Sequence, residues 1–451
     1  MQIQVAKLRD GLGLLKNVVP RKPTLDILKN VCLGNGEIRA TDLETTVVIP
    51  FPEADTPCLL PYNIILKMLQ YTNGGEYLTI TPEDKNVALE WSEGRTSLNV
   101  EDVNEYPALQ EFKEVVGADL DSDALVAAMM SVLLYAATED SRPVLQGVIL
   151  KLGDPFHVMA GDGFRLAYQI LPLTFPEEKI TVVPIGTTKA FAHIWEKTPR
   201  VARATDSLVA NITAKKPVHL SFNDTLGIRF TFDKMATIYA KTIDGNPPEF
   251  LKLIPEEEPV FRSHFMANDL QVAAQRAGNI ASRTSNVLRM LFDEGKVIVE
   301  AIADEQEIQS TVRTFNSTGE PYKLGLNNLY LLDYLNGKTG VVKIECHGDG
   351  HPVIFQCQNT PRVIIMPMNV NWDGTPPEDE TPADEDAAAD ESAQNPEETE
   401  TESDTPEDET AETEPEPVEE EVNPEVSQEE EPAAVTAAAE PKKPKGKRKK
   451  A

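Results

Sequence analysis

Residues 160–167, AGDGFRLA, are the segment that most resembles a phosphate-binding loop, because Gly161 and Gly163 flank an acid and an arginine follows. A loop of the G-x-G-x-x-G type needs a third glycine and a helix that begins directly after it. Leu166 stands where that glycine is required, and residues 166–170 predict a strand. The segment therefore does not predict a nucleotide site.

Other short motifs with chemical potential are also weak. The stretch NGKTG at 336–340 resembles the end of a P-loop, but Leu332 stands where the first glycine belongs. Cys346, His347 and His351 are close enough in sequence to hold a metal, yet the glycines between them favour a hairpin turn. With six histidines in all and no nucleophile elbow, the sequence predicts no catalytic site, no metal and no cofactor.

One pattern recurs three times along the chain. Residues 23–49, 141–170 and 284–312 each predict an apolar strand, a turn, a second strand that ends in Ala-x-Asp, and a third strand. The aspartates of the three copies are Asp42, Asp162 and Asp304. We interpret them as turn carboxylates that accept hydrogen bonds from backbone amides. On this interpretation the role of Asp162, the acid between the two glycines, is structural.

Helices complete each copy. Apolar residues spaced three and four apart predict a helix before each triplet of strands, as for Leu8, Leu12 and Leu15, and a second helix follows, at 61–73, 187–198 and 328–337. The plan per copy is strand, helix and three strands, repeated twice, which predicts an α+β fold. We expect three such domains, at 1–117, 118–255 and 256–370.

Composition separates the remaining residues, 371–451, from the rest of the chain. They hold 28 acidic and 7 basic residues, so this tail carries a net charge of −21 out of −32 for the whole chain, and it ends in a basic run. With almost no large apolar side chain, the tail is expected to be disordered. The four cysteines lack C-x-x-C spacing, and no apolar segment is long enough to span a membrane, so we expect a cytoplasmic protein.

Basic residues recur on the expected helices. Arg9 and Lys16 are seven residues apart, as are Arg276 and Arg283, and Lys189 and Lys197 are eight apart. These spacings are close to two helical turns, which would keep each pair on one face. Such pairs are often ordinary solvated positions, but on one shared surface they would form a positive track that binds phosphates without regard to base sequence.

Segments spread over residues 1–370 resemble the beta subunit of bacterial DNA polymerase III, the sliding clamp family. The segments that carry the resemblance, in order, are RKPTLDIL (21–28), ATDLE (40–44), RPVLQGV (142–148), GDGFRLA (161–167), YAKTIDGNPPEFLKLIP (239–255), LGLNNLYLLDYL (324–335) and VIIMPM (363–368). The resemblance implies three similar domains, a head-to-tail homodimeric ring around double-stranded DNA with helices lining the hole, and a non-catalytic role as processivity factor for the replicative polymerase.

The resemblance also implies a groove that accepts short linear peptides from the polymerase, the clamp loader and repair proteins. Carried onto this chain, the groove comprises Leu145, Gly163, Phe164, Arg165, Leu166, Pro248, Lys252, Leu253, Asn327, Tyr330, Ile364, Met366, Pro367 and Met368. Gly161 and Phe164 replace a threonine and a histidine of the family pattern, which makes this wall more apolar. The family normally ends two residues after the last of these methionines, so the tail is a departure.

The resemblance adds Lys22, which matches a family arginine near the pore, to the cation pairs of the expected helices, and it implies the residues that close the ring. The expected DNA-facing cations are Arg9, Lys16, Lys22, Lys189, Lys197, Arg276 and Arg283. The ring interface is expected to join the strand that carries Arg95 and Leu98 to the helix around Ile280 of the partner. Two other readings stay open: a peptide-binding scaffold that does not act on DNA, and an enzyme within a repeat fold.

Overall fold

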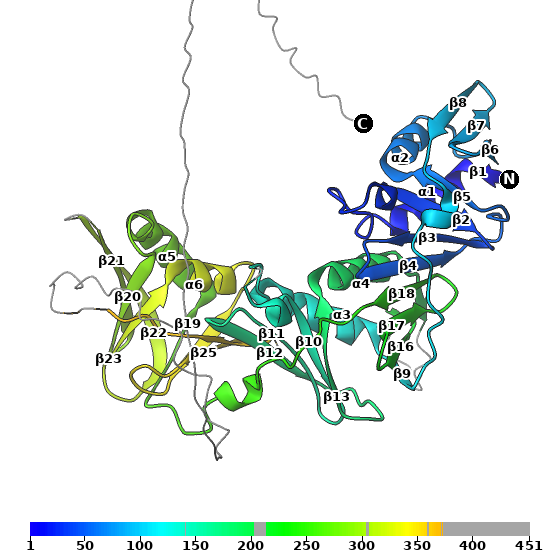
Figure 1. Ribbon diagram of the computed structural model, residues 1–451. Coiled ribbons are helices and arrows are strands. Elements are labelled where there is room, and N and C mark those ends of the chain that lie inside the picture. Colours follow the sequence, from blue (N-terminus) through cyan, green and yellow to red (C-terminus); the bar gives the residue numbers. More distant parts are fainter. Residues whose placement is uncertain (140, 203–212, 304–305, 359, 371, 373–451) are drawn as a thin grey trace, which may run out of the picture. The chain divides into compact units, whose positions relative to one another are not determined.

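The computed structural model describes residues 1–139, 141–202, 213–303, 306–358, 360–370 and 372. Asp304 and the tail from residue 373 onward therefore lie outside the described residues. Within them, the predicted α+β plan of strand, helix and three strands, twice per copy, is confirmed in all three copies (Figure 1). None of the described helices is both long and apolar enough to cross a membrane.

The three copies have the same order of elements. The first contains β1 (Gln2–Gln4), α1 (Val5–Leu14), β2 (Asn30–Gly34), β3 (Glu37–Thr41), β4 (Thr45–Pro50), β5 (Cys58–Pro61), α2 (Tyr62–Gln70), β6 (Tyr77–Pro82), β7 (Asn86–Trp91) and β8 (Gly94–Asn99). The second contains β9 (Val116–Leu120), α3 (Ser122–Val132), β10 (Gly147–Leu152), β11 (Phe156–Gly161), β12 (Arg165–Leu171), β13 (Lys179–Pro184), α4 (Ile185–Lys197), β14 (Arg200–Ala202), β15 (Thr213–Lys215), β16 (Val218–Asn223), β17 (Gly227–Phe232) and β18 (Ala236–Ala240). The third contains β19 (Phe261–Met266), α5 (Ala267–Ala281), β20 (Val287–Asp293), β21 (Lys296–Ala303), β22 (Gln306–Thr318), β23 (Tyr322–Asn327), α6 (Asn328–Leu335), β24 (Val341–Cys346), β25 (Val353–Cys357) and β26 (Arg362–Ile365).

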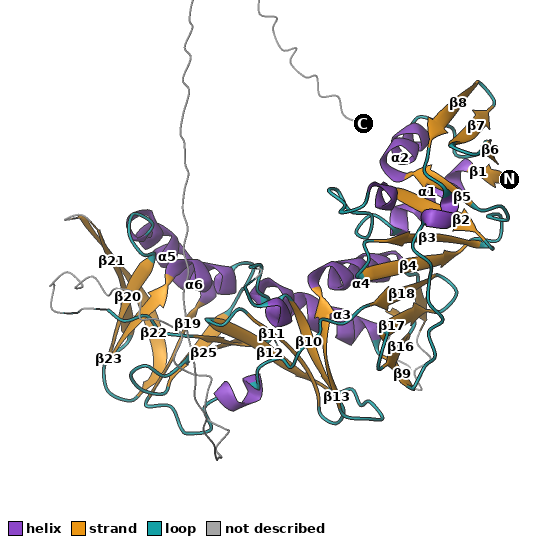
Figure 2. Ribbon diagram, viewed as in Figure 1, coloured by secondary structure: helices purple, strands orange, loops and turns teal. Residues whose placement is uncertain are grey.

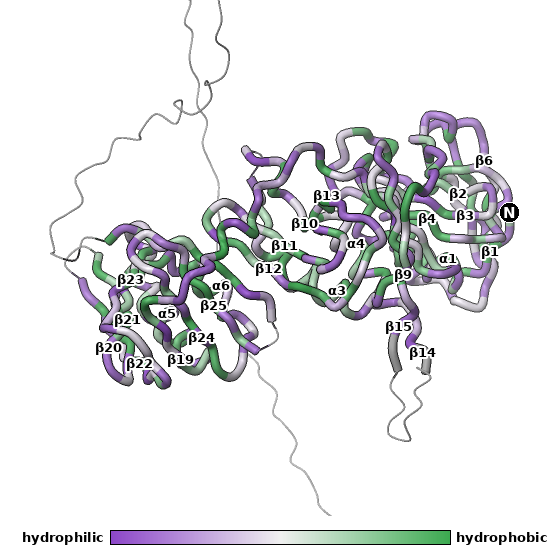
Figure 3. Tube along the Cα trace, turned by 90° about the horizontal axis from the view of Figure 1, so that it is seen from below, coloured by the Kyte–Doolittle hydropathy of each residue, from purple (hydrophilic) through white to green (hydrophobic). Residues whose placement is uncertain are grey.

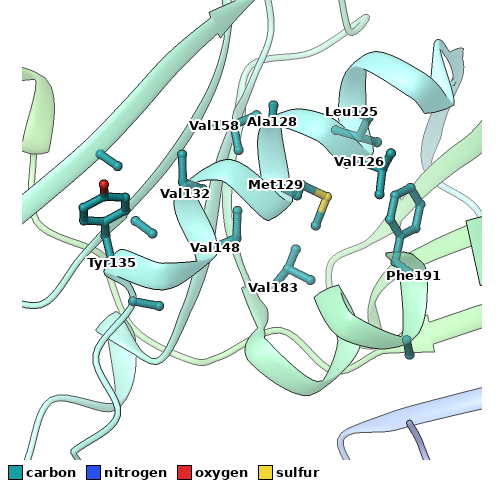
Figure 4. Packing of buried hydrophobic residues seen from close by; sticks show 14 of the residues in the cluster. Leu125, Val126, Ala128, Met129, Val132, Tyr135, Val148, Val158, Val183 and Phe191 are labelled. Atoms are coloured by element: carbon teal, nitrogen blue, oxygen red, sulfur yellow. The ribbon is translucent and has the colours of Figure 1, made fainter. Parts of the chain in front are cut away.

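Two helices pack against each other in every copy, α1 with α2, α3 with α4 and α5 with α6 (Figure 2). These helices bury the apolar stripes that the sequence predicted. Figure 4 shows Met129 and Val132 of α3 facing Val148 and Val183 of the sheet, with Phe191 of α4 close by. Each such side chain, fully buried, contributes roughly 1.5–3 kcal/mol. In α5 the buried face is mostly alanine, which allows close approach: a Cβ atom at Gly278 would lie 2.4 Å from Asn328 Nδ2 of α6.

The sheets cross from one copy to the next. β4 of the first copy pairs antiparallel with β18 of the second, with Val48 opposite Thr237. β12 of the second copy pairs antiparallel with β26 of the third, with Arg165 opposite Ile365. At both junctions, therefore, the fourth strand of one copy pairs with the last strand of the next copy.

The second copy departs from the shared plan after α4. Six residues separate α2 from β6 and five separate α6 from β24, whereas twenty separate α4 from β16. This longer segment contains the β14–β15 hairpin, which extends beyond the neighbouring elements in Figure 3. Lys215 holds the base of the hairpin, because its ammonium group lies 4.2 Å from the Trp195 ring centroid and donates to the Glu196 carbonyl at 2.9 Å.

Candidate functional site

The turn between β11 and β12 is the Gly-rich segment of the sequence, and it has a structural role. Asp162 Oδ1 accepts hydrogen bonds from the backbone amides of Phe164 at 3.0 Å and Arg165 at 2.9 Å. Gly163 has φ +94°, a left-handed conformation that favours glycine. Asp42 makes the same pair of bonds to Glu44 and Thr45 in the first copy, so the interpretation of both aspartates as turn carboxylates is confirmed.

Arg165 ties this turn to the third copy. Its Nε donates to Asp162 Oδ2 at 2.8 Å, and its Nη1 donates to Asp333 Oδ2 of α6 at 2.7 Å. The guanidinium carbon also lies 4.6 Å from the Tyr330 ring centroid, a cation–π contact. Burial lowers the pKa of Arg165, but the hydrogen bonds to Asp333 and Asp162 outweigh it, so the pKa is raised and the side chain stays charged.

An apolar groove opens beside this turn, at the junction of the second and third copies. Its cavity measures about 180 Å³ and is lined by Gly163, Phe164, Arg165, Leu166, Phe250, Leu253, Pro352, Ile364 and Met366. The rim is unusually hydrophobic for a surface, because Phe164 is 58% exposed, Leu253 54% and Met366 41%. Exposed apolar side chains gathered at a concave site indicate a surface that binds a partner.

Seven of the residues that the resemblance implied line this groove, and the others lie around it. Leu145 is buried in a small core behind the groove, together with Leu166 and Ile364. Tyr330 stacks on Phe164 with ring centroids 6.4 Å apart, and Asn327 caps α6 through the amide of Leu329 at 2.9 Å. The cavity lining does not include Leu145, Tyr330 or Asn327, and it does not include the four that remain, Pro248, Lys252, Pro367 and Met368.

Two lining residues were not foreseen. Phe250 is buried in the 3-10 turn Phe250–Leu253, and the glycine at position 161 makes room for it, since a Cβ atom there would lie 3.1 Å from the Phe250 ring. Pro352 belongs to the turn between β24 and β25, directly after His351, the last residue of the stretch that could have held a metal. In the part of the chain that the structure describes, no three histidine, cysteine or carboxylate side chains gather as metal ligands. The only sequence signal for Phe250 was its place within the motif that supplied Pro248 and Leu253.

Only one of the three predicted cation pairs lies on a single helix. Lys189 and Lys197 both lie on α4 and are exposed. The prediction of one shared helix is wrong for the other two pairs, because α1 ends at Leu14, before Lys16, and α5 ends at Ala281, before Arg283. The chain turns at these points, in the first case keeping Leu15 and Val18 buried.

Contacts between α1 and α4 bring the cations of two copies near one another. His193 Nε2 lies 2.8 Å from the carbonyl oxygen of Gly13, and Asn17 Nδ2 donates to the Lys189 carbonyl at 3.2 Å. Lys16 is next to Asn17 and is exposed, as are Lys22, Arg276 and Arg283. Arg283 donates to Gln306 Oε1 at 2.7 Å. The exposed cations thus continue from the first copy to the second.

Arg9 is engaged in holding two helices together. Its Nη2 donates to the carbonyl of Thr72 at 2.9 Å and to that of Leu69, both at the C-terminal end of α2. Arg9→Ala is expected to lower the free energy of unfolding by about 2 kcal/mol, because half-buried carbonyls lose a charged donor. Urea unfolding monitored by circular dichroism measures this. Lys16→Ala is the control and is expected to leave stability unchanged; equal stability of both variants would contradict the structural role of Arg9.

The residues expected at a ring interface lie on β8 and α5. Arg95 is exposed on β8, whereas Leu98 on the same strand and Ile280 on α5 are half-buried. Among the described strands, β8 pairs only with β7, so its other edge has free backbone groups. An edge strand of this kind is a ready partner for another chain.

Comparison with known proteins was made by family model, by sequence and by structure. No family model matches the chain. It is 23% identical over 357 residues to the beta sliding clamp of Caulobacter vibrioides, an alignment that covers 74% of this chain and 89% of that protein. The DNA polymerase III beta subunit of Thermotoga maritima superimposes with a TM-score of 0.71 and 17% identity, covering 82% of this chain and 99% of that one.

A third comparison concerns the groove. The beta sliding clamp of C. crescentus, solved with polyethylene glycol at the region assigned to beta-motif tethering, superimposes with a TM-score of 0.71 and 20% identity. It covers 82% of this chain and 99% of that one. The fold of residues 1–370 is therefore the fold that these proteins share.

Proposed function

We propose that this chain, a member of the beta sliding clamp family by its sequence and its fold, works as a sliding clamp. Two copies close into a ring around duplex DNA and tether the replicative polymerase for processive synthesis. The role is mechanical, so the chain itself makes and breaks no bonds. We also propose that the protein acts in the cytoplasm of a bacterial cell. The three copies then correspond to domains at residues 1–117, 118–255 and 256–370.

The pairing of strands between copies carries the proposal of a closed ring. The fourth strand of the first copy and of the second copy pairs with the last strand of the next copy, as β4 does with β18 and β12 with β26. The same rule leaves β22 of the third copy and β8 of the first without such a partner among the described strands. A second copy of the chain supplies the missing partners: its β8 pairs with β22 of the first chain, and its β22 pairs with β8 of the first chain. These two contacts are related by a two-fold axis, and together they close the ring.

The groups at these two edges support that pairing. The first part of β22, Gln306 to Arg313, pairs with β21 on one side, and the pairing of β22 with β19 involves only residues 314–318. β8 pairs on one side with β7 through all six of its residues. Both edges therefore offer unsatisfied backbone donors and acceptors, and antiparallel pairing satisfies them. Arg95 and Leu98 then lie in the interface.

Cations on the helices and in the segments that follow them would hold the DNA. Lys16, Lys22, Lys189, Lys197, Arg276 and Arg283 are exposed, and α1 and α4 contact each other across a junction. Because a ring is linked to DNA topologically, weak attraction of these cations to phosphates is sufficient and does not depend on base sequence. Partners that carry a short apolar peptide, such as polymerase, clamp loader and repair proteins, would bind the groove, and tethering would raise their concentration at the DNA.

Retention on DNA tests this function directly. The protein, loaded onto a nicked circular plasmid with a clamp loader, is expected to co-elute with the plasmid in gel filtration. Cutting the plasmid once is expected to release nearly all of it, because a linked ring runs off free ends. Blocking both ends with bulky bound proteins is the control and should restore retention. Equal retention on circular and linear DNA would instead indicate ordinary electrostatic binding, and no retention on either would favour a scaffold that does not act on DNA.

A further inference from the structure

The junction of the first and second copies has the same register as the junction that carries the groove. Thr45 of β4 lies opposite Ala240 of β18, just as Arg165 of β12 lies opposite Ile365 of β26. Thr45 and Arg165 each close a turn whose aspartate accepts hydrogen bonds from the amides of that turn. Each position at one junction can therefore be matched with a position at the other.

The match continues past the ends of the last strands. The Lys241 amide donates to the Glu44 carbonyl at 2.8 Å, and the Met366 amide donates to the Phe164 carbonyl at 2.9 Å. Glu44 therefore occupies the position of Phe164, and Lys241 occupies the position of Met366. Phe164 and Met366 are exposed apolar walls of the groove, whereas the same backbone geometry at the first junction presents two exposed charges.

A hollow of about 440 Å³ lies at the first junction, in the place that corresponds to the groove. The groove is lined by the β11–β12 turn, the segment between the second and third copies, the β24–β25 turn and β26. The hollow is lined by the β3–β4 turn, the segment between the first and second copies, the β16–β17 turn and β18. Because the copies share one order of elements, these are four pairs of counterparts. We call the hollow the apolar chamber, after its lining residues Leu43, Pro107, Leu109, Phe112, Leu226 and Tyr239.

Leu43 is held in an unfavourable conformation at the edge of the apolar chamber. Its φ is +80°, in the left-handed region, and its side chain is 47% exposed. The matching residue of the second copy is Gly163, which adopts φ +94° without strain. A leucine here stabilises the fold neither through its backbone nor through burial, which indicates that its side chain serves binding.

One wall of the apolar chamber is fixed before any partner arrives. Phe112 meets Tyr239 edge to face, with ring centroids 5.9 Å apart, and the Arg229 guanidinium carbon lies 4.6 Å from the Phe112 centroid. Arg229 Nη2 in turn donates to Glu114 Oε2 at 2.8 Å. These contacts fasten the segment between the copies to β17 and β18, so a partner would meet a preformed aromatic surface.

A second hollow, of about 630 Å³, adjoins the first and shares Leu43, Glu44 and Lys241 with it. Asp244 also belongs to its lining and is exposed. Among the residues that the structure describes, Glu44, Asp244 and Lys241 form no ion pair. Two carboxylates and one ammonium group leave an excess of negative charge in this lining. We call the second hollow the acidic chamber.

We propose that the two chambers form a second groove, which binds an extended peptide that carries an apolar side chain close to a basic one. The apolar side chain enters the apolar chamber, and the basic side chain faces Glu44 and Asp244. The inference goes beyond the proposed function, because it adds a site of different chemistry at another junction. It rests on that function in one respect, since the corresponding groove is proposed to bind peptides.

Three synthetic peptides test the proposal. They share a Leu-Phe pair and carry arginine, serine or glutamate two residues away on both sides, and binding is measured by fluorescence anisotropy. The protein is the full chain with Leu253→Asp, a change in the first groove that is expected to stop peptides from binding there. The arginine peptide is expected to bind this protein at least about tenfold more tightly than the glutamate peptide.

Two further changes, each made in the same protein, locate the binding. Leu43→Gly removes an apolar wall and is expected to weaken binding of the arginine peptide about fivefold to tenfold. The thermal unfolding midpoint is not expected to fall, because glycine adopts this conformation without strain. Glu44→Gln combined with Asp244→Asn is expected to reduce the preference for arginine over glutamate below about threefold.

A matched pair of neutralised acids separates the second groove from the acidic character of the whole chain. Glu83→Gln combined with Glu93→Gln changes two exposed acids of the first copy that line neither chamber, and it is expected to leave the arginine preference unchanged. A loss of preference as large as that of the Glu44 and Asp244 pair would show that net charge alone attracts the peptide, and the inference would be wrong.

The inference also fails if the arginine peptide does not bind the Leu253→Asp protein, or if Leu43→Gly leaves its affinity unchanged. Either result would leave the proposed function standing, because that function is judged by retention of the unaltered protein on circular DNA.

Discussion

Ile280→Asp is expected to convert the dimer into a monomer and to abolish retention on circular DNA. Ile280 is half-buried near the end of α5, a helix that packs on β21 and β22, so its side chain lies next to the edge proposed to pair with β8 of the partner. A carboxylate buried without a partner costs several kcal/mol, and a two-fold ring repeats that cost at both interfaces. Light scattering should show the mass falling from twice 49.7 kDa to 49.7 kDa.

Two further variants separate loss of the interface from loss of folding. Arg95→Glu changes an exposed residue of β8 and is expected to shift the same equilibrium toward monomer with the thermal unfolding midpoint unchanged. Gln275→Asp, on the same helix as Ile280 but about 140° around its axis, is expected to remain dimeric. A dimer that survives both Ile280→Asp and Arg95→Glu would place the interface elsewhere and would refute the pairing of β8 with β22.

The repeat was readable from sequence because each copy buries the same pattern. Leu8, Leu12 and Leu15 recur at helical spacing, and all three are fully buried. The turn at Asp162 was also foreseeable, because an aspartate followed by glycine can satisfy neighbouring amides locally. These features depend on residues close together in the sequence, where spacing alone specifies the geometry.

Features that depend on distant residues were missed. No spacing rule connects Arg165 with Asp333, yet this ion pair joins the second copy to the third. Arg9 is a second example. The sequence predicts that it lies on a helix, but only the folded structure shows that its guanidinium group already donates to a carbonyl at the end of α2. Helix ends were equally hidden, because the buried side chains that follow α1 turn the backbone before Lys16.

The groove lies between these two cases. Resemblance to the sliding clamps implied the motif residues Gly163, Phe164 and Met366, and all three line the same cavity. Phe250 and Pro352 complete the same cavity from a 3-10 turn and a hairpin turn that sequence reasoning did not connect with it. A binding surface assembled from separate loops needs the fold before its full outline is visible.

Leu253→Asp is expected to weaken binding of an apolar peptide to this groove by at least about 100-fold, because the peptide would bury a carboxylate that has no partner. Leu253 is 54% exposed in the free protein, so the change should leave the fold intact. The measurement is fluorescence anisotropy with a labelled synthetic peptide that has a Leu- and Phe-containing apolar core, together with thermal unfolding to show that the variant is folded.

Lys252→Ala is the matched control, because Lys252 occupies the same 3-10 turn but pairs with Glu249 and is not part of the cavity lining. Its peptide affinity is expected to stay within about twofold of the original, since exposed ion pairs contribute little. If the lysine variant lost as much affinity as the aspartate variant, the turn as a whole rather than the apolar wall would govern binding. If neither lost affinity, the peptide would bind at another surface, and Phe164, Leu253 and Met366 would be exposed for another reason.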